Sequence, residues 1–181
     1  CGGLQILGNV IHDEEKRESK DGTIEGLGIL DIESSFSRAG KIVTQSTATI
    51  PDKLEGLAGE IFKNITGEEV NGYEIHEGTS ELLNSTALLN IKKGQGNNDD
   101  GVIDGASNGN AFGTYFHGIF HNYNFRREFL NYIRIKKGLE AKYGEDPYET
   151  QKDYSLNRLA EIVEEHLDMD IIDELIFGKK E

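Results

Sequence analysis

The sequence is poor in the residues that mark several classes of protein. Its 181 residues include one cysteine, two prolines and no tryptophan. A lone cysteine, Cys1, excludes an intrachain disulfide framework and a cysteine-rich zinc module. No stretch approaches the roughly 18 consecutive apolar residues that a membrane helix needs, and no basic and apolar leader is present. We therefore expect a cytoplasmic protein with no membrane partner.

Positive charge is also scarce. The chain has 19 Lys and Arg residues against 33 Asp and Glu residues, which gives a formal net charge of −14. Such a surface is unsuited to displacing counterions from a phosphate backbone, so we expect no nucleic-acid partner. With 36% apolar and 29% charged residues, the composition is typical of a globular protein. The length suits one core, and we expect residues 1–181 to belong to a single domain.

The hydrophobic pattern predicts alternating helices and strands. Apolar residues at three- and four-residue spacings predict a helix over 3–12, directly after Cys1. Short apolar or β-branched runs predict strands, and longer periodic runs predict further helices. The predicted strands cover 26–31, 41–50, 73–78, 86–91, 102–103 and 111–116, and the later helices cover 54–65, 124–138 and a C-terminal segment at about 153–178. The sequence therefore predicts an α/β fold with a mixed sheet flanked by helices, and the apolar stripe of the C-terminal segment is expected to cover the core.

The opening Cys1-Gly2-Gly3 suits a catalytic thiol at the start of a helix. Glycines tolerate a sharp turn and the close approach of a substrate. The first turn of a helix offers free N–H groups and a partial positive charge, which favour a thiolate and stabilise an oxyanion. A lone cysteine is more often an inert small hydrophobe. Two interpretations stay open: a cysteine that belongs inside a larger domain, or a processed N-terminal nucleophile.

A cysteine hydrolase needs a base, and the sequence offers five histidines. His117 ends a predicted strand and precedes Gly118, which suits a side chain presented at the carboxyl edge of a sheet. His76 lies on another predicted strand, where a structural role and a place at the same site are equally expected. For the other histidines we expect a surface or structural role. They are His12, His121 and His166. The sequence therefore favours His117 as the base for Cys1.

Metal and nucleotide sites have little support in the sequence. His117 and His121 are four residues apart, but no carboxylate lies between them and Gly118 disfavours a helix there. The acidic turn at 97–101 lacks the alternating ligands and distal glutamate of a calcium loop. No G-x-x-x-x-G-K-[ST] phosphate loop is present. We expect no metal and no ATP to bind to this segment.

Four motifs carry a resemblance to a known family, and they occur in that family's order. They resemble the glutaminase domain of CobQ-type cobyric acid synthases, and the ending His166-Leu167-Asp168-Met169 also resembles the family's C-terminal helix. The similarity covers nearly the whole chain. The four motifs are Cys1-Gly2-Gly3-Leu4-Gln5-Ile6-Leu7-Gly8, Gly26-Leu27-Gly28-Ile29-Leu30, Gly72-Tyr73-Glu74-Ile75-His76-Glu77-Gly78 and Gly113-Thr114-Tyr115-Phe116-His117-Gly118-Ile119-Phe120.

The resemblance implies a flavodoxin-like class I glutamine amidotransferase domain. In that family the cysteine matching Cys1 attacks the side-chain amide of glutamine, the histidine matching His117 shuttles the proton, and ammonia is the useful product. The ammonia amidates corrin carboxylates, converting adenosylcobyrinic acid a,c-diamide to adenosylcobyric acid, with ATP and Mg on a separate synthetase domain. The resemblance also implies that five further residues contact or wall the glutamine site: Gly2, Gln5, Tyr73, Glu74 and His76.

Two departures from the wider class affect this expectation. Most class I glutaminases carry a carboxylate two residues beyond the histidine, whereas this chain has Ile119, so the sequence gives a Cys-His dyad. Either Glu74 or another group orients the imidazole, or the base works without that support. The family also has sheet strands and an oxyanion loop before the cysteine. We therefore expect a domain truncated before the nucleophile and inactive by itself.

Other functions stay open at this stage. Related CobQ-like amidotransferases, such as cobyrinic acid diamide synthase or the amidotransferase acting on cell-wall lipid precursors, share the chemistry. An N-terminal nucleophile amidohydrolase would use the α-amine of Cys1 as base, although it wants the cysteine at the start of a strand. A non-catalytic binding module with a glutaminase fold is the third alternative.

Overall fold

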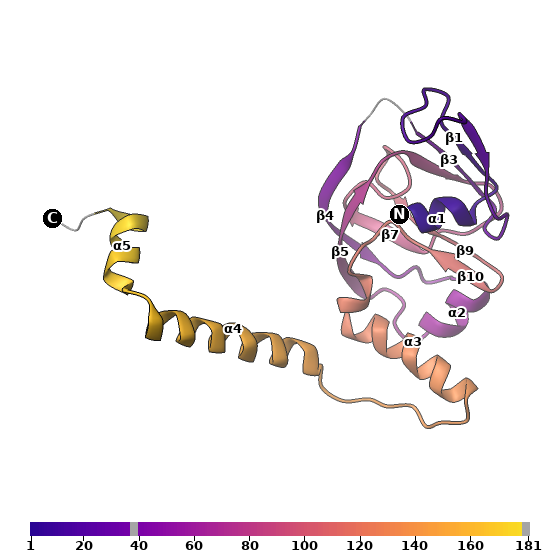
Figure 1. The fold of residues 1–181 in the computed structure, drawn as a ribbon. Helices are drawn as coiled ribbons and strands as arrows, with labels where there is room; N and C mark the ends of the chain where they lie inside the picture. Colours follow the sequence, from indigo (N-terminus) through magenta and orange to yellow (C-terminus); the bar gives the residue numbers. More distant parts are fainter. Residues whose placement is uncertain (37–39, 179–181) are drawn as a thin grey trace. The chain divides into compact units, whose positions relative to one another are not determined.

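The computed structural model describes residues 1–36 and 40–178, apart from the side chain of Glu149. The chain divides into two compact units, Cys1–Lys142 and Tyr143–Glu181. The first unit contains all the described strands together with the helices α1, α2 and α3, and the second contains two helices (Figure 1).

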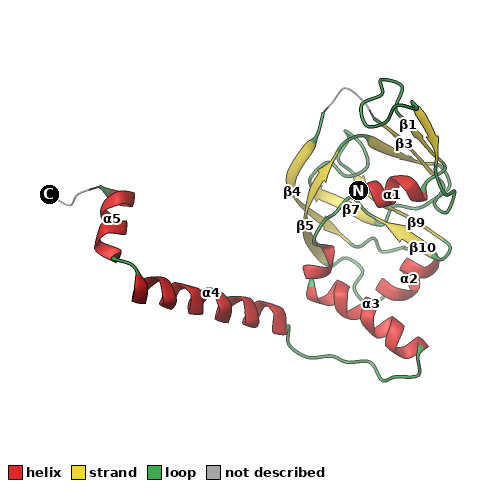
Figure 2. Cartoon of the chain, in the orientation of Figure 1, coloured by secondary structure: helices red, strands yellow, loops and turns green. Residues whose placement is uncertain are grey.

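The described strands of the first unit form three sheets (Figure 2). One has the order β5-β4-β7-β8 and is antiparallel throughout, whereas β2-β1-β3-β6 combines antiparallel pairs with a parallel β1–β3 pair. The third is the hairpin of β9 and β10. The strand bounds are β1 Val10–His12, β2 Thr23–Glu25, β3 Ile32–Ser35, β4 Ile42–Thr49, β5 Glu69–His76, β6 Thr79–Leu82, β7 Leu89–Lys93, β8 Ile103–Asp104, β9 Ala106–Asn108 and β10 Ala111–Gly113.

The main core lies between the antiparallel sheet and two helices. Helix α2 (Gly56–Phe62) and helix α3 (Tyr123–Lys136) contribute Phe62 and Phe125, whose rings stack with centroids 4.2 Å apart. Inward residues of β4 and β5, such as Ala48 and Val70, pack against them. The strand expected at 41–50 and the helices expected at 54–65 and 124–138 are confirmed, because β-branched alternation and helical spacing agree with burial there.

The first helix is shorter than the sequence predicts. Helix α1 covers Gly2–Leu7, and the residues expected to continue it form strand β1 instead. The segment at 26–31, expected to be a strand, is a loop that wraps the end of α1. Its N–H groups donate to carbonyls of residues 6–9, for example Leu27 to Ile6 at 2.8 Å and Gly28 to Gly8 at 2.8 Å. A Cβ on Gly26 would overlap the carbonyl oxygen of Gly8, so the loop requires glycine at that position.

Later strand predictions are correct in part. Strand β5 confirms the strand expected at 73–78 but begins earlier, and β7 and β8 are shifted from the expected 86–91 and 102–103. The strand expected at 111–116 stops at Gly113. Beyond it, His117 joins the edge of β5 through an isolated bridge to Tyr73, and a 3₁₀ turn, η1, follows at Ile119–His121.

The second unit consists of α4 (Pro147–His166) and α5 (Met169–Phe177), where the sequence predicts a helical segment. Asp146 and Asp168 cap the two helices through their side chains. Within this unit the apolar stripe is exposed, with Leu159 at 57% and Leu175 at 80%, and its expected contact with the core stays a prediction. Among residues 1–36 and 40–178, no helix combines the length and the apolar character that crossing a bilayer requires.

The structure therefore confirms a mixed α/β fold of sheets and helices. It differs from the expectation of one mixed sheet, because the described strands are divided among three sheets and only β1 and β3 pair in parallel. The reason is local: the glycine-rich loop at 26–31 and the turn-rich segment at 94–101 interrupt runs that would otherwise extend one ladder.

Candidate active site around Cys1 and His117

Cys1 lies at the start of α1, as the sequence predicts. It is the N-cap residue, its carbonyl accepts from the N–H of Leu4 at 2.8 Å, and its terminal nitrogen donates to Thr114 O at 2.9 Å. The thiol is free and partly exposed. A Cβ on Gly2 would meet no atom within 4 Å, so the space beside the thiol is open on that side. The cysteine thus combines a fixed backbone with an accessible sulfur.

His117 is held against β5 by its main chain and by its ring. The N–H of His117 donates to Tyr73 O at 2.8 Å, and the N–H of Tyr73 donates to His117 O at 3.1 Å. The two rings stack, with centroids 5.2 Å apart and planes 13° apart. The Nε2 atom of His117 is buried and has no hydrogen-bond partner within the described protein. A buried ring nitrogen in that state is available to accept a proton.

The surroundings of His117 lower the pKa of its imidazole below the ordinary value. Burial is the largest cause and His76 adds to it, while a hydrogen bond with the Ile75 carbonyl opposes the shift. A lowered pKa keeps the ring neutral near pH 7, the form that a general base needs.

The carbonyl of Ile75 brings the thiol and the imidazole together. The Sγ atom of Cys1 donates to this oxygen at 3.5 Å, and the His117 ring hydrogen-bonds the same carbonyl. Residues 1 and 117 are remote in sequence and meet because β5 lies between their elements. Both residues therefore lie at the same carbonyl, and their catalytic roles stay predictions.

Glu74 and His76 lie on the opposite face of β5 from Tyr73 and Ile75. Both are fully buried, and their side chains pair through Glu74 Oε2 and His76 Nε2 at 3.1 Å. The sequence raises Glu74 as a candidate to orient His117, and the structure is different. Donors from His76, Ser46 and the loop at 95–96 occupy both Glu74 oxygens. Strand alternation separates the two sets of side chains.

A buried hydroxyl cluster lies behind the helix. Gln5, expected to contact glutamine, is 6% exposed, and its Nε2 donates to Glu77 O at 3.0 Å and to Tyr115 OH at 3.2 Å. The Tyr115 hydroxyl also bonds Ser80 Oγ at 2.6 Å, and its ring stacks on His76 at 3.9 Å. The amide nitrogen of Gln5 is therefore held by the protein, and its contact with a substrate stays a prediction.

Asp104 is a second buried carboxylate near this cluster. It accepts hydrogen bonds from Thr114 Oγ1 and, at 3.1 Å, from the N–H of Tyr115. Burial is the main cause that raises the pKa of Asp104 to about 6, and the charge of Glu74 adds to it. The sequence analysis missed this residue because an acid after a short strand has no signature of its own.

The described side chains offer little to a metal ion. Across residues 1–36 and 40–178, no group of three or more His, Cys, Asp or Glu side chains is placed to hold one. The remaining histidines have local partners: His12 lies 3.6 Å from Glu33, and His166 bonds the Ile162 carbonyl at 2.9 Å.

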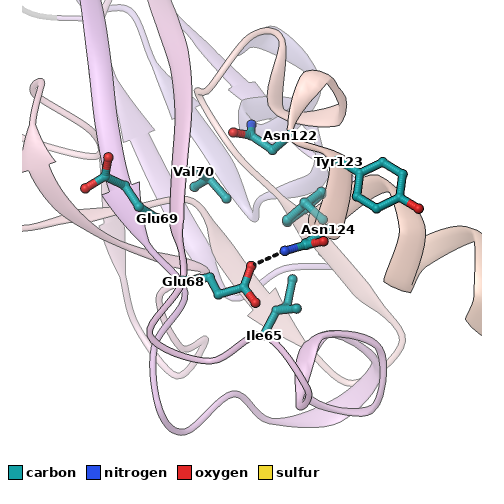
Figure 3. Close-up of a pocket in the computed structure, with 8 residues that line it drawn as sticks. Ile65, Glu68, Glu69, Val70, Asn122, Tyr123 and Asn124 are labelled. Atoms are coloured by element: carbon teal, nitrogen blue, oxygen red, sulfur yellow. Dashed lines mark hydrogen bonds between the residues drawn. The ribbon is translucent and has the colours of Figure 1, made fainter. Parts of the chain in front are cut away.

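A surface cavity of about 230 Å³ lies at the other end of β5. Glu68, Glu69 and Val70 line one side of it, and Asn122 to Phe125 line the other (Figure 3). Asn124 donates to Glu68 at 2.7 Å across it. The Asn122 side chain bonds the main chain of Asn71, so this region fastens the start of α3 to β5.

The sequence did not indicate the Ile75 carbonyl, which hydrogen-bonds both the Cys1 thiol and the His117 ring. Every residue carries such a group, so nothing in the side-chain pattern distinguishes it. The sequence marks this part of β5 only indirectly. Two polar residues, Glu74 and His76, lie on the inner face of the strand, which is otherwise apolar.

Comparison with known proteins agrees with this geometry. The sequence is 46% identical to a probable cobyric acid synthase of Methanothermobacter thermautotrophicus over 179 residues, which is 98% of this chain and 34% of the relative. It is 44% identical to a probable cobyric acid synthase of Methanosphaera stadtmanae over 97% of this chain and 34% of the relative. A cobyric acid synthase of Dehalococcoides mccartyi is 40% identical over 95% of this chain and 33% of the relative.

The chain thus spans about one third of the length of these relatives. Over residues 1–125, it matches the profile of a protein family described as the CobB/CobQ-like glutamine amidotransferase domain. That range contains Cys1, β5 and His117. The chain belongs to the family of CobB/CobQ-like glutamine amidotransferase domains.

Proposed function

We propose that this chain is the glutaminase part of a cobyric acid synthase and releases ammonia from glutamine. The observation that carries the proposal is the meeting of the Cys1 thiol and the His117 imidazole at the Ile75 carbonyl, within a chain of this family. A cysteine beside a neutral histidine is the pair that nucleophilic amide hydrolysis needs.

The reaction follows from these two side chains. Cys1 Sγ attacks the side-chain carbonyl carbon of glutamine while His117 accepts the thiol proton. His117 then returns that proton to the nitrogen as the C–N bond breaks, so ammonia leaves and a thioester remains. Water attacks the thioester, passing one proton through His117 back to the sulfur, and glutamate is released. One water is consumed for each ammonia formed.

The ammonia is proposed to serve corrin amidation. The relatives with 40–46% identity are named cobyric acid synthases, so we infer that adenosylcobyrinic acid a,c-diamide is the acceptor and adenosylcobyric acid the product. ATP and Mg would act on the synthetase part of a longer protein. This chain has no G-x-x-x-x-G-K-[ST] phosphate loop. We further expect a flavodoxin-like sheet in the whole domain and a cytoplasmic location.

The alternatives differ from this proposal in specific contacts. An N-terminal nucleophile enzyme needs its cysteine at the start of a strand, whereas Cys1 caps helix α1. Other CobQ-like amidotransferases would use the same dyad with a different acceptor. A binding module would not need a thiol beside a neutral imidazole.

Labelling with a glutamine analogue tests the proposal. The longer synthase containing this chain is treated with 6-diazo-5-oxo-L-norleucine and analysed by peptide mass spectrometry. We expect one adduct, on Cys1, that free glutamine suppresses and that the matched Cys1→Ser variant does not form. The proposal would be refuted, and the binding module favoured, if the wild-type protein did not label at Cys1. Labelling that free glutamine does not suppress would refute it as well.

A further inference from the structure

The residues of β5 next to the dyad alternate between two roles. Tyr73 and Ile75 are each more than one third exposed, and their main chain or ring contacts His117. Glu74 and His76 are at most 2% exposed and face inward. The peptide that carries the Ile75 carbonyl therefore lies between two buried, polar side chains.

Glu74 is tied to three separate parts of the first unit. Its Oε1 accepts from Ser46 Oγ on β4 at 2.5 Å and from the N–H of Gln95 at 3.1 Å. Its Oε2 accepts from the N–H of Gly96 at 2.7 Å and from His76 Nε2 at 3.1 Å. Burial by itself would raise the pKa of Glu74, but these hydrogen bonds lower it below its ordinary value. The carboxylate is therefore ionised and fixed by four donors.

His76 is fixed on both sides of its ring. Its Nε2 faces the Glu74 carboxylate, and its Nδ1 lies 3.3 Å from the carbonyl of Gly78. Each ring nitrogen therefore has a polar neighbour within hydrogen-bond distance. The ring also stacks on Tyr115, which is fully buried. The geometry therefore describes a buried Glu74–His76 pair whose polar atoms are all engaged.

The groups that could orient His117 directly are few. Ile119 is apolar and belongs to the main core, and both oxygens of Glu74 are occupied by other donors. Among the described residues, the Ile75 carbonyl hydrogen-bonds both the ring and the thiol. A carbonyl oxygen has two lone pairs, so it can accept from both. It also favours the protonated imidazole that forms when His117 takes the thiol proton.

We propose that the buried Glu74–His76 pair positions the Cys1–His117 dyad by holding the Ile75 carbonyl against both residues. This inference rests on the proposed glutaminase function and adds to it. Glu74 and His76 are then positioning residues that act through the main chain of β5, in place of the glutamine contacts predicted from the sequence. Tyr73 completes the arrangement by stacking on the His117 ring from the outer face of the same strand.

Steady-state kinetics of the longer synthase separates positioning from substrate binding. The test variant is Glu74→Gln, which keeps the shape of the side chain and removes its charge. Because a displacement of about 1 Å can cost about 100-fold in rate, we expect kcat for glutamine hydrolysis to fall roughly 10- to 100-fold. The KM for glutamine should change less than about twofold, because the ground-state contacts are untouched. Activity with added ammonia should be retained.

The matched control is Asn131→Ala in α3. Asn131 is a buried polar residue whose amide bonds the main chain of Lys142, away from β5. Its loss should lower the melting temperature without changing kcat or the pH profile. If Glu74→Gln does not fold, Ser46→Ala removes one of the four donors to Glu74, and we expect the same kcat-selective loss at a few-fold size.

The outcomes distinguish this inference from the proposed function. A KM increase with unchanged kcat in Glu74→Gln would mean that Glu74 binds glutamine and would overturn the positioning role. Unchanged kinetics in a folded Glu74→Gln or Ser46→Ala protein would overturn it as well, while an active wild-type synthase would keep the glutaminase proposal intact. A wild-type protein with no glutamine hydrolysis would instead contradict the proposed function itself.

Discussion

The two faces of β5 show how one strand serves chemistry and stability at once. On the outer face, Tyr73 and the Ile75 carbonyl contact His117 and Cys1, and the Nε2 of His117 has no partner among the described residues. On the inner face, Glu74 and His76 have all their polar atoms engaged. The His117 side chain therefore keeps a ring nitrogen without a hydrogen bond among the described residues, whereas the polar atoms of Glu74 and His76 are all hydrogen-bonded. The difference predicts that outer-face changes alter activity and inner-face changes alter folding and position.

The largest expected effect comes from removing the reactive pair. Cys1→Ala and His117→Ala should each abolish glutamine-dependent amidation by the longer synthase, because the nucleophile or its base is lost. Ammonia bypasses the glutaminase step, so the Cys1→Ala protein should keep its activity with added ammonium salt. Product formation with each nitrogen source provides the measurement. Loss of both activities in a folded Cys1→Ala protein would contradict the role given to this thiol.

A change of intermediate expected effect concerns Asp104, a buried carboxylate on β8. The pKa of this carboxyl is raised from 3.8 to about 6, mainly by burial. The folded chain therefore holds the proton to higher pH than the unfolded chain does, and the stabilisation is complete below pH 3.8 and declines as pH rises through 6. The decline amounts to about 3 kcal/mol.

The Asp104→Asn variant should lack that decline, because an amide does not ionise. Denaturant unfolding between pH 4 and pH 7 measures the free energy of unfolding for both proteins. We expect the curves to diverge as pH rises, with the variant the more stable at pH 7. Parallel curves would mean that Asp104 is ionised in the folded state throughout this range.

The smallest expected effect is on the outer face, at Tyr73. Replacing the ring in Tyr73→Leu uncovers the His117 imidazole. Since burial is the largest cause of its lowered pKa, that pKa should rise towards the ordinary histidine value, and the acidic limb of the pH–activity profile should move to higher pH. Tyr73→Phe keeps the stacked ring and should behave as wild type in an NMR titration of His117. An equal shift in both variants would show that the hydroxyl, and not the stacking, matters.

The sequence predicted the parts of the site that depend on side-chain type, and missed those that depend on the main chain. Cys1 before a helix and His117 after an apolar run were chosen as candidates because thiols and imidazoles are rare and their chemistry is specific; the structure places both at the Ile75 carbonyl, and their roles stay predictions. The alternation of β4 and β5 was also readable. The approach of His117 to Tyr73 was not, because an isolated bridge between segments 44 residues apart leaves no periodic pattern.

At 26–31 the sequence predicted a regular element, a strand, that the structure does not contain. The apolar residues of this loop resemble a short strand, yet their N–H groups serve the carbonyls at the end of α1. A helix of six residues leaves most of its carbonyls without hydrogen-bond partners inside the helix. The N–H groups of the loop supply these bonds, and the segment therefore does not form a strand. The run Gly-Leu-Gly-Ile-Leu by itself does not indicate which main-chain groups it will hydrogen-bond.

That loop has a consequence for the thiol at the other end of α1. The helix is too short to be rigid by itself, and its far end is bound by a segment whose close approach only a glycine at position 26 allows. A methyl group at position 26 would push the loop away from helix α1. Because α1 has only six residues, its shift would also displace the Cys1 sulfur at its start. Gly26, which lies outside the proposed dyad, thereby helps to fix the position of the Cys1 thiol.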